Sequence, residues 1–264
     1  MRVAWLTDIH LNFLRPGERR IFFDRLAKQN FDAVLVGGDI GEGQTVASYL
    51  AAMADALRVP IYFVLGNHDF YHSSIASTRS AVASQAAASP NLHYLSESGV
   101  VSLTATTALV GHDSWADGRL GDFFGSSVML NDYVLIADFE DLYQKDRFTK
   151  LNSLGDEAAA FLEARALEAL ASHQHVVVLT HVPPFREACW HEGRISDDDW
   201  IPHFGCRAVG ERLATVARAH PEQSLTVLCG HTHSPGVAQI LPNLVVYTGA
   251  AEYGKPIIQR VFEF

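Results

Sequence analysis

The amino-acid sequence predicts an α/β fold built around a parallel β-sheet. Short apolar runs, each typical of a strand buried on both faces, alternate with segments in which apolar residues recur at helical spacing. The first three apolar runs each end in a turn of polar residues. The resulting order β-α-β-α-β implies parallel strands, and the ligands of such sheets collect beyond the carboxyl ends of the strands.

The N-terminal part of the chain supplies the first three strands of this sheet. Strands are expected over residues 2–7, 33–36 and 61–65, and helices over 18–30, 45–57 and 74–88. The first helical segment has Ile21, Phe22 and Leu26 at helical spacing, and the second is rich in alanine, a strong helix former. The three strands end in Thr7-Asp8-Ile9-His10, Gly37-Gly38-Asp39 and Gly66-Asn67-His68-Asp69.

The C-terminal part of the chain adds further strands. Strands near 100–103 and 107–111 are expected to begin a second sheet, and helices are expected over 155–172 and 207–219. Buried strands near 176–181 and 225–229 end in His181 and in Gly230-His231-Thr232-His233. The tail, residues 236–241, 244–248 and 256–263, alternates in the manner of antiparallel strands.

Two irregular segments, 113–150 and 183–206, are interpreted as loop insertions. The first is rich in aromatic residues such as Phe123, Tyr133 and Phe148, whose common role is packing; a cover over the active site is the alternative. No repeat, low-complexity run or linker divides the chain. We therefore expect residues 1–264 to form a single domain.

Composition excludes several classes of protein. Nearly half of the 264 residues are apolar, enough for a substantial core, and the net charge of −10 argues against broad binding to nucleic acid or to an anionic membrane. Three scattered cysteines are too few for a disulfide framework or a cysteine zinc site. No apolar stretch approaches the ~20 residues that span a bilayer, and no leader precedes the first strand. A soluble, cytoplasmic protein is expected.

The strand ends share one property, which is that each carries side chains able to bind a metal ion. Each turn taken singly has an ordinary structural explanation, but five of them in one chain, each after a buried strand, indicate a site. The candidate ligands are Asp8, His10, Asp39, Asn67, His181, His231 and His233, with His68 beside them.

The kind of ligand indicates the kind of metal. Imidazole, carboxylate and amide oxygen without thiolate suit Mn, Fe or Zn better than Ca. There are too many ligands for one ion that keeps an open position, and enough for two ions that share a carboxylate. Because alternate residues of an extended backbone point in different directions, His231 and His233 could each serve a different ion.

These five blocks, in this order, resemble the calcineurin-like metallophosphoesterase superfamily, and the resemblance covers essentially the whole chain. It implies a four-layer sandwich in which two mixed β-sheets are flanked by α-helices. It also implies the division of the ligands: Asp8, His10 and His233 on one divalent ion, Asn67, His181 and His231 on the other, and Asp39 bridging. His68 would face the scissile phosphoester without binding metal.

The resemblance implies a metal-dependent phosphohydrolase that acts on a small phosphorylated substrate. Two divalent ions hold a phosphate oxygen and lower the pKa of a bridging water, so a metal-bridging hydroxide is the expected nucleophile. His68 is expected to assist the leaving group or to steady the charged transition state, and Asp39 belongs to the catalytic centre. Asp69 either orients a neighbour or caps the following turn.

One departure from the family pattern bears on the substrate. Phosphoprotein phosphatases of the superfamily carry Gly-Asp-x-x-Asp-Arg-Gly after the second strand, whereas this chain has Gly38-Asp39-Ile40-Gly41-Glu42-Gly43. The missing arginine disfavours a protein phosphatase and favours the bacterial-type phosphoesterases of small molecules. Glu42 could still support His68 by a hydrogen bond, or be a simple turn residue.

Alternatives remain at the level of substrate and of class. A phosphodiesterase or a nuclease of the same superfamily is possible, although the acidic charge and the lack of a basic stripe disfavour nucleic acid. A metal-bound interaction module would be expected to lack a ligand or His68, and none is missing.

Substrate contacts must come from loops. Arg186, Arg194 and His191 follow the His181 strand and could bind a phosphate, or the arginines could be ordinary surface residues. A phosphomonoester is a dianion and would favour such arginines, whereas a diester needs less positive charge. The oligomeric state does not follow from the sequence.

Overall fold

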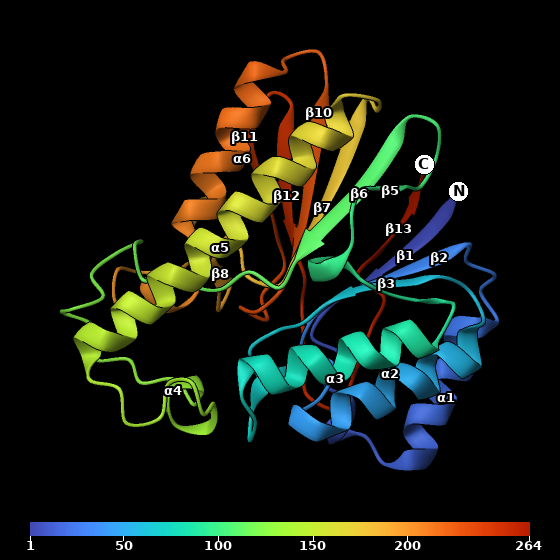
Figure 1. Cartoon of the computed structure of the whole chain (residues 1–264), viewed down its shortest axis with the longest axis horizontal. Coiled ribbons are helices and arrows are strands. Elements are labelled where there is room, and N and C mark those ends of the chain that lie inside the picture. Colours follow the sequence, from blue (N-terminus) through green and yellow to red (C-terminus); the bar gives the residue numbers. More distant parts are fainter.

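Two β-sheets pack face to face at the centre of the protein, and helices cover the outer face of each (Figure 1). The structure is a computed structural model that describes all residues from 1 to 264. This four-layer arrangement of two mixed sheets flanked by helices confirms the predicted fold class.

The five-stranded sheet contains the β-α-β-α-β unit predicted from the sequence. Its strand order is β13-β1-β2-β3-β4, in which the first four strands of the chain are parallel and β13 is antiparallel to β1. The strands are β1 (Arg2–Leu6), β2 (Ala33–Gly37), β3 (Ile61–Val64), β4 (Leu92–Tyr94) and β13 (Arg260–Glu263). The helices on its outer face are α1 (Pro16–Ala27), α2 (Val46–Leu57) and α3 (Ile75–Ala88).

The six-stranded sheet has the order β11-β12-β10-β7-β6-β5. Its strands are β5 (Val101–Ser102), β6 (Thr107–His112), β7 (His175–Thr180), β10 (Ser224–Cys229), β11 (Gly236–Leu241) and β12 (Leu244–Thr248). The four central strands are parallel and the two edge strands are antiparallel. Helices α5 (Gln144–Leu170) and α6 (Arg207–Ala219) cover its outer face.

Each strand of the tail has an antiparallel neighbour, as predicted, but the strands belong to two different sheets. Strands β11 and β12 form an antiparallel hairpin, but β12 also pairs in parallel with β10, and β13 leaves this sheet to join β1. The amino group of Met1 accordingly donates to the carbonyl of Phe264 at 2.6 Å, so the two ends of the chain lie together.

Apolar side chains between the layers explain why the sequences of the strands are continuous apolar runs. Val3, Trp5 and Leu35 from the five-stranded sheet pack against Val177 and Leu228 from the six-stranded sheet, while alternate residues of the same strands face the helices. Such strands are buried on both faces, and burial of each large apolar side chain contributes roughly 1.5–3 kcal/mol. That residues 1–264 form one domain stays a prediction, although the two sheets share this central apolar layer.

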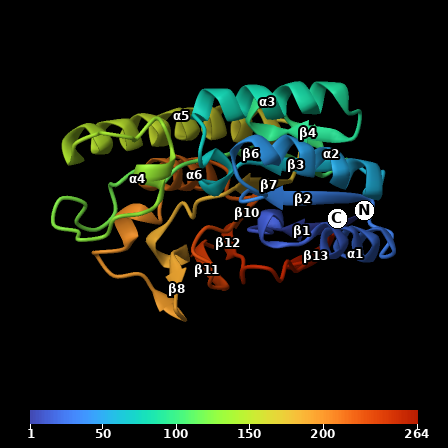
Figure 2. The same cartoon turned by 90° about the horizontal axis from the view of Figure 1, so that it is seen from below.

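The two insertions lie at one end of the molecule (Figure 2). Segment 113–150 contains α4 (Asp132–Leu135) and the start of α5, which begins at Gln144 instead of residue 155 because Phe148, Leu151 and Leu154 extend its apolar face over the insertion. Segment 183–206 contains the hairpin of β8 (Trp190–His191) and β9 (Arg194–Ile195). Among the helices, none has the length and apolar character that a membrane crossing requires.

Short 3-10 turns follow several strands and shape the loops. They are η1 (Leu11–Phe13), η2 (Gly43–Thr45), η3 (His68–Phe70), η4 (Leu95–Glu97), η5 (Arg186–Ala188) and η6 (Ile201–His203).

Candidate metal centre

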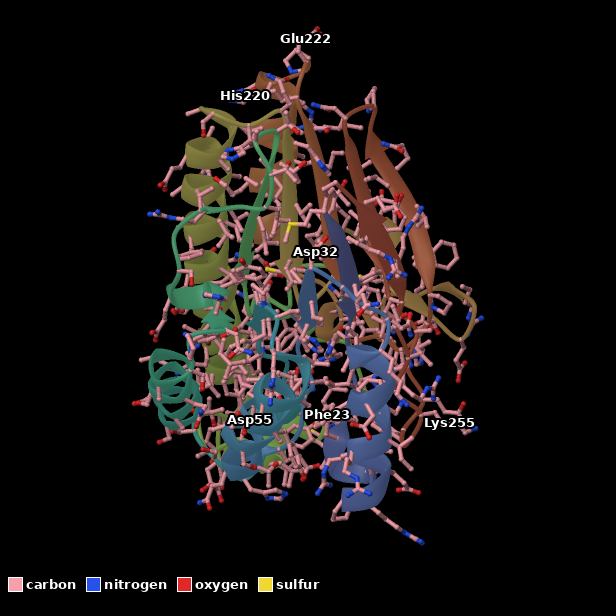
Figure 3. The ribbon with its side chains drawn as sticks, turned by 90° about the vertical axis from the view of Figure 1, so that its right-hand side faces the viewer. Phe23, Asp32, Asp55, His220, Glu222 and Lys255 are labelled. Atoms are coloured by element: carbon pink, nitrogen blue, oxygen red, sulfur yellow. The ribbon has the colours of Figure 1, made fainter.

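Five loops meet where the carboxyl ends of strands from both sheets converge. Three loops follow β1, β2 and β3 of the five-stranded sheet, and two follow β7 and β10 of the six-stranded sheet. In Figure 3, His220 and Glu222 mark the end of the molecule at which β10 begins. Lys255, which follows β12, lies toward the opposite end. The predicted ligands are therefore brought together from two sheets that face each other.

The backbone of these loops is held in an unusual conformation. Residues other than glycine rarely adopt a positive φ, although Asp, Asn and His do so more often than others, and each instance costs about 1–3 kcal/mol. Five of the candidate ligands have a φ between 40° and 71°, namely Asp8, His10, Asp39, His231 and His233. The left-handed conformation turns the chain sharply, so that the side chains of short loops converge on one place.

Two glycines in the motifs are required by close approach of carboxylates. A Cβ at Gly66 would collide with the carboxylate of Asp39, and one at Gly230 would collide with the carboxylate of Asp8. Any larger residue at either position would displace a candidate ligand.

The first group of donors is formed by Asp8, His10, Asp39 and His233. One ligand atom from each lies within 4.8 Å of the others. The Nε2 atoms of His10 and His233 are 3.2 Å apart, and His233 Nε2 lies 3.4 Å from Asp8 Oδ1. Asp39 Oδ2 lies 3.7 Å from His10 Nε2. Imidazole nitrogens and carboxylate oxygens gathered this closely make a fitting set of ligands for a divalent ion.

The second group of donors is centred on the side-chain oxygen of Asn67. Asn67 Oδ1 lies 3.1 Å from His181 Nε2 and 2.9 Å from His231 Nδ1. His181 Nε2 is also 3.5 Å from Asp39 Oδ1. The two oxygens of Asp39 thus face different groups of donors, Oδ2 the first and Oδ1 the second.

Hydrogen bonds behind the second group fix which atom of each side chain faces inward. A carbonyl oxygen only accepts, so His181 donates Nδ1–H to Gly37 at 2.8 Å and His231 donates Nε2–H to His203 at 3.0 Å. In a neutral imidazole the opposite ring nitrogen carries no proton and is available to bind metal, an arrangement typical of metal-binding histidines. Asn67 Nδ2 donates to Asp132 Oδ1 at 2.8 Å.

Sequence reasoning missed His203 and Asp132. Both lie in the insertions, and neither follows a predicted strand, so no strand-end pattern marks them. Their role depends on tertiary contacts alone, and a single sequence contains no signal that would have identified them.

The electrostatics of the site suit metal ligands. Burial lowers the pKa of His10 and that of His231 to about 3, so both imidazoles are neutral near pH 7, the form that binds metal. Burial, together with the negative charges of Asp8 and Asp69, raises the pKa of Asp39 well above its ordinary value. Carboxylates buried so close together need a compensating positive charge, which divalent ions supply.

Asp69 joins two of the loops to each other. Its carboxylate is fully buried and accepts hydrogen bonds from the backbone N–H groups of Ile40 and Gly41, both at 2.8 Å, and of Gly66 at 2.9 Å. Burial raises its pKa to about 7. Of the two hypotheses for Asp69, the one in which it orients its neighbours agrees with these contacts.

His68 lies beside the donors at the edge of the site. Its side chain is 16% exposed, and its Nε2 is 4.0 Å from Asp39 Oδ2. Its ring lies over the ring of Tyr71, with centroids 4.3 Å apart, and burial lowers its pKa to about 4. The hypothesis that Glu42 supports His68 is wrong, because Glu42 Oε1 accepts a hydrogen bond from Asn12 and His68 Nδ1 has no partner.

Two exposed aromatic residues lie next to the first group of donors. Phe13 and Tyr253 are 50% and 46% exposed, and their ring centroids are 4.5 Å apart. The Tyr253 ring is also 4.7 Å from that of His10 and 5.2 Å from that of His233. Sequence reasoning missed this pair, because neither residue stands in a ligand motif.

The three candidate substrate residues of segment 183–206 do not join the donors. Arg186 makes an ion pair with Asp198 at 2.7 Å and lines a separate cavity of about 670 Å³ beside α6. Arg194 is exposed in the β8–β9 hairpin. His191 packs against Phe204, whose ring in turn contacts that of His231, so His191 lies one side chain away from the site.

Comparison with known proteins agrees with this fold. The profile of the calcineurin-like phosphoesterase family matches residues 1–235. The structure is similar to that of a phosphopantetheinyl hydrolase from Mycobacterium tuberculosis (TM-score 0.65, 14% identity, 95% of this chain and 89% of that chain covered). It is also similar to a dimetal phosphatase from Danio rerio (TM-score 0.59, 16% identity, coverage 95% and 87%). At such identities these structures show the fold alone. No curated protein sequence matches the chain.

Proposed function

The chain belongs to the calcineurin-like phosphoesterase family, as its motifs predicted, and on that premise we propose that it hydrolyses a phosphoester bond of a small substrate at the site described. Its class is that of the binuclear-metal phosphoesterases, which are hydrolases. We propose Mn, Fe or Zn as the two divalent ions. The observation that carries the proposal is the buried carboxylate of Asp39, whose two oxygens face two separate groups of donors.

The proposed ligands are assigned to the two ions by the distances between their donor atoms. The first ion would be held by Asp8, His10 and His233, the second by Asn67, His181 and His231, and Asp39 would lie between them. When bound, such a pair of ions holds a phosphoryl oxygen and lowers the pKa of water. Among the proposed ligands only Asp8 and Asp39 are carboxylates, and they offset about half of the four positive charges, so the ions keep a positive charge that favours an anionic substrate.

His68 has the position of a group that acts on substrate. It is partly exposed, it lies beside Asp39, and it belongs to neither group of donors. Its backbone N–H donates to Asp39 Oδ1 at 2.9 Å, which holds the residue against the site, while the Nδ1 of its ring has no hydrogen-bond partner. We propose that the imidazole donates to the leaving oxygen or to the charged phosphoryl group.

A phosphodiester is the second candidate substrate class, and the position of the arginines favours it. A monoester dianion would gain from guanidinium groups, yet Arg186 is paired with Asp198 and Arg194 lies in an exposed hairpin. A singly charged diester needs less positive charge than the dianion. Nucleic acid is disfavoured by the net charge of −10.

Removal and return of metal tests the proposed function. Protein stripped with a chelator should lose hydrolysis of p-nitrophenyl phosphate and bis-p-nitrophenyl phosphate, and Mn²⁺ should restore it. The reason is that no other cation is available to the buried carboxylates and neutral imidazoles of the site. A panel that adds 2′,3′- and 3′,5′-cyclic nucleotides, each assayed with Mn, Fe and Zn, would rank monoesters against diesters. Protein that is fully loaded and hydrolyses none of these esters would contradict the proposal and favour an interaction module.

Replacement of Tyr253 by alanine tests whether the exposed aromatic pair contacts substrate. Stacking on an aromatic side chain contributes about 1–3 kcal/mol per planar group, so KM for an aryl ester should rise by roughly 5-fold to 160-fold while kcat changes little. KM for a matched alkyl ester should stay within about 2-fold, and Tyr253→Phe should behave as wild type. An equal rise for both esters would show that Tyr253 acts on the metal ligands instead.

A further inference from the structure

We propose that Asp132 is a positioning residue for the second metal ion, because it fixes the side-chain amide of Asn67 with the oxygen facing inward. This inference rests on the proposed function, in which Asn67 Oδ1 is a ligand. Asp132 lies in α4, within insertion 113–150, and belongs to neither group of donors.

The hydrogen bonds around Asn67 determine its orientation. An ionised carboxylate only accepts hydrogen bonds, so the amide nitrogen of Asn67 must face Asp132 Oδ1, which lies 2.8 Å away. The amide oxygen then faces His231 and His181, at 2.9 and 3.1 Å. An amide rotated by 180° would present N–H groups to the second ion and an oxygen to a carboxylate, and both changes are repulsive.

The same carboxylate oxygen also holds the residue that supports His68. The hydroxyl of Tyr71 donates to Asp132 Oδ1 at 2.7 Å, and the Tyr71 ring lies over that of His68. Asp132, Asn67 and Tyr71 are all buried, so bulk water cannot take the place of a lost partner. Asp132 therefore links a metal ligand to the ring beneath the proposed catalytic histidine.

Backbone hydrogen bonds fasten α4 against the loop that carries Asn67. His72 donates its N–H to the carbonyl of Leu135 at 2.7 Å, and Ala137 donates to Ser73 at 3.0 Å. Insertion 113–150 is thus fixed to the segment that follows η3. It contacts the site on the side where Asn67 lies.

The second insertion supports the same group of donors. The carbonyl of His203 accepts from His231 Nε2, and the ring of His203 is bonded to the hydroxyl of Tyr133, the residue after Asp132. Asn67 and His231, two of the three proposed ligands of the second ion, therefore have their outer partners in the insertions, whereas Asp8 of the first group is bonded by Thr7 and by the backbone of His231.

Metal titration of variants tests the inference. Loss of an outer partner of a ligand lowers metal affinity by about 10-fold to 100-fold, so Asp132→Ala should bind the second Mn²⁺ that much more weakly and the first as wild type does. Metal analysis after equilibrium dialysis measures this directly. Electron paramagnetic resonance provides a second readout, because two neighbouring Mn²⁺ ions give an exchange-coupled signal that Asp132→Ala should replace by that of a single ion.

Two further variants separate positioning from general damage to the insertion. Asp132→Asn can still present an oxygen to Asn67 and Tyr71, and should recover most of the lost affinity. Asp138→Ala removes a carboxylate of the same insertion that accepts from the Ile75 N–H and from Lys150, and should bind both ions as wild type does. If Asp132→Ala does not fold, as judged by circular dichroism, the nearly isosteric Asp132→Leu takes its place with the same expectation.

The outcomes distinguish this inference from the proposed function. Wild-type protein that binds fewer than two ions would overturn both. If wild type binds two ions and Asn67→Ala loses one, while Asp132→Ala keeps two with unchanged affinity and a coupled signal, only the positioning role of Asp132 is overturned. Selective loss of the second ion, restored in Asp132→Asn, would establish it.

Discussion

Replacement of Asp39 by alanine is expected to abolish the uptake of two metal ions and to lower kcat/KM by at least about 10³-fold. Asp39 is 1% exposed, and its two oxygens face both groups of donors, so its loss would remove a proposed ligand from each ion at once. Bound metal supplies several kcal/mol of transition-state stabilisation, and about 4 kcal/mol corresponds to 10³-fold in rate.

Metal analysis and steady-state kinetics on the same protein samples measure this effect. Asp39→Asn keeps the size of the side chain and an acceptor for the His68 N–H but loses the charge, so it should resemble Asp39→Ala in metal content and turnover. Asp55→Asn, at an exposed position of α2 (Figure 3), is the matched control and should behave as wild type. An Asp39→Ala protein with unchanged activity would contradict the proposal that two ions are bound at this site.

Replacement of His68 by alanine is expected to separate metal binding from chemistry. Both ions should stay bound, because His68 belongs to neither group of donors, whereas kcat should fall by about 10²-fold to 10³-fold, the usual contribution of one hydrogen-bond donor to a charged transition state. The loss should be larger for an alkyl ester than for a p-nitrophenyl ester, since p-nitrophenolate leaves without needing a proton.

Control variants decide how that result is interpreted. His220 lies at the end of the molecule opposite the candidate site (Figure 3), so His220→Ala should retain wild-type kcat. Unchanged turnover of His68→Ala would remove this histidine from the mechanism. Equal losses for the two leaving groups would assign it to stabilisation of the phosphoryl charge rather than to a hydrogen bond with the leaving oxygen.

The strands were predictable because they are buried on both faces. Runs such as Val34-Leu35-Val36 and Val176-Val177-Val178 must be apolar at every position, which separates them clearly from the amphipathic helices. The candidate ligands were predictable for a related reason, since parallel strands place their carboxyl ends together and polar residues there have few structural explanations.

Features that depend on distant contacts were not predictable. Strand β4 is only three residues long, and its sequence, Leu92-His93-Tyr94, shows no extended apolar run. Asp132 and His203 contact Asn67 and His231 through hydrogen bonds across the fold, which leave no periodic trace in the sequence. Arg186 has a nearby carboxylate partner in Asp198, and sequence alone could not show that this ion pair forms away from the donors.

The convergence of two sheets on one site has a thermodynamic consequence. Each ion would draw donors from both halves of the molecule: Asp8 and His10 with His233 in one case, and Asn67 with His181 and His231 in the other. Such an ion links the two sheets to each other, and it binds only to the folded protein. Scarcity of metal would then weaken the entire protein, and its folding yield would follow the supply of cations.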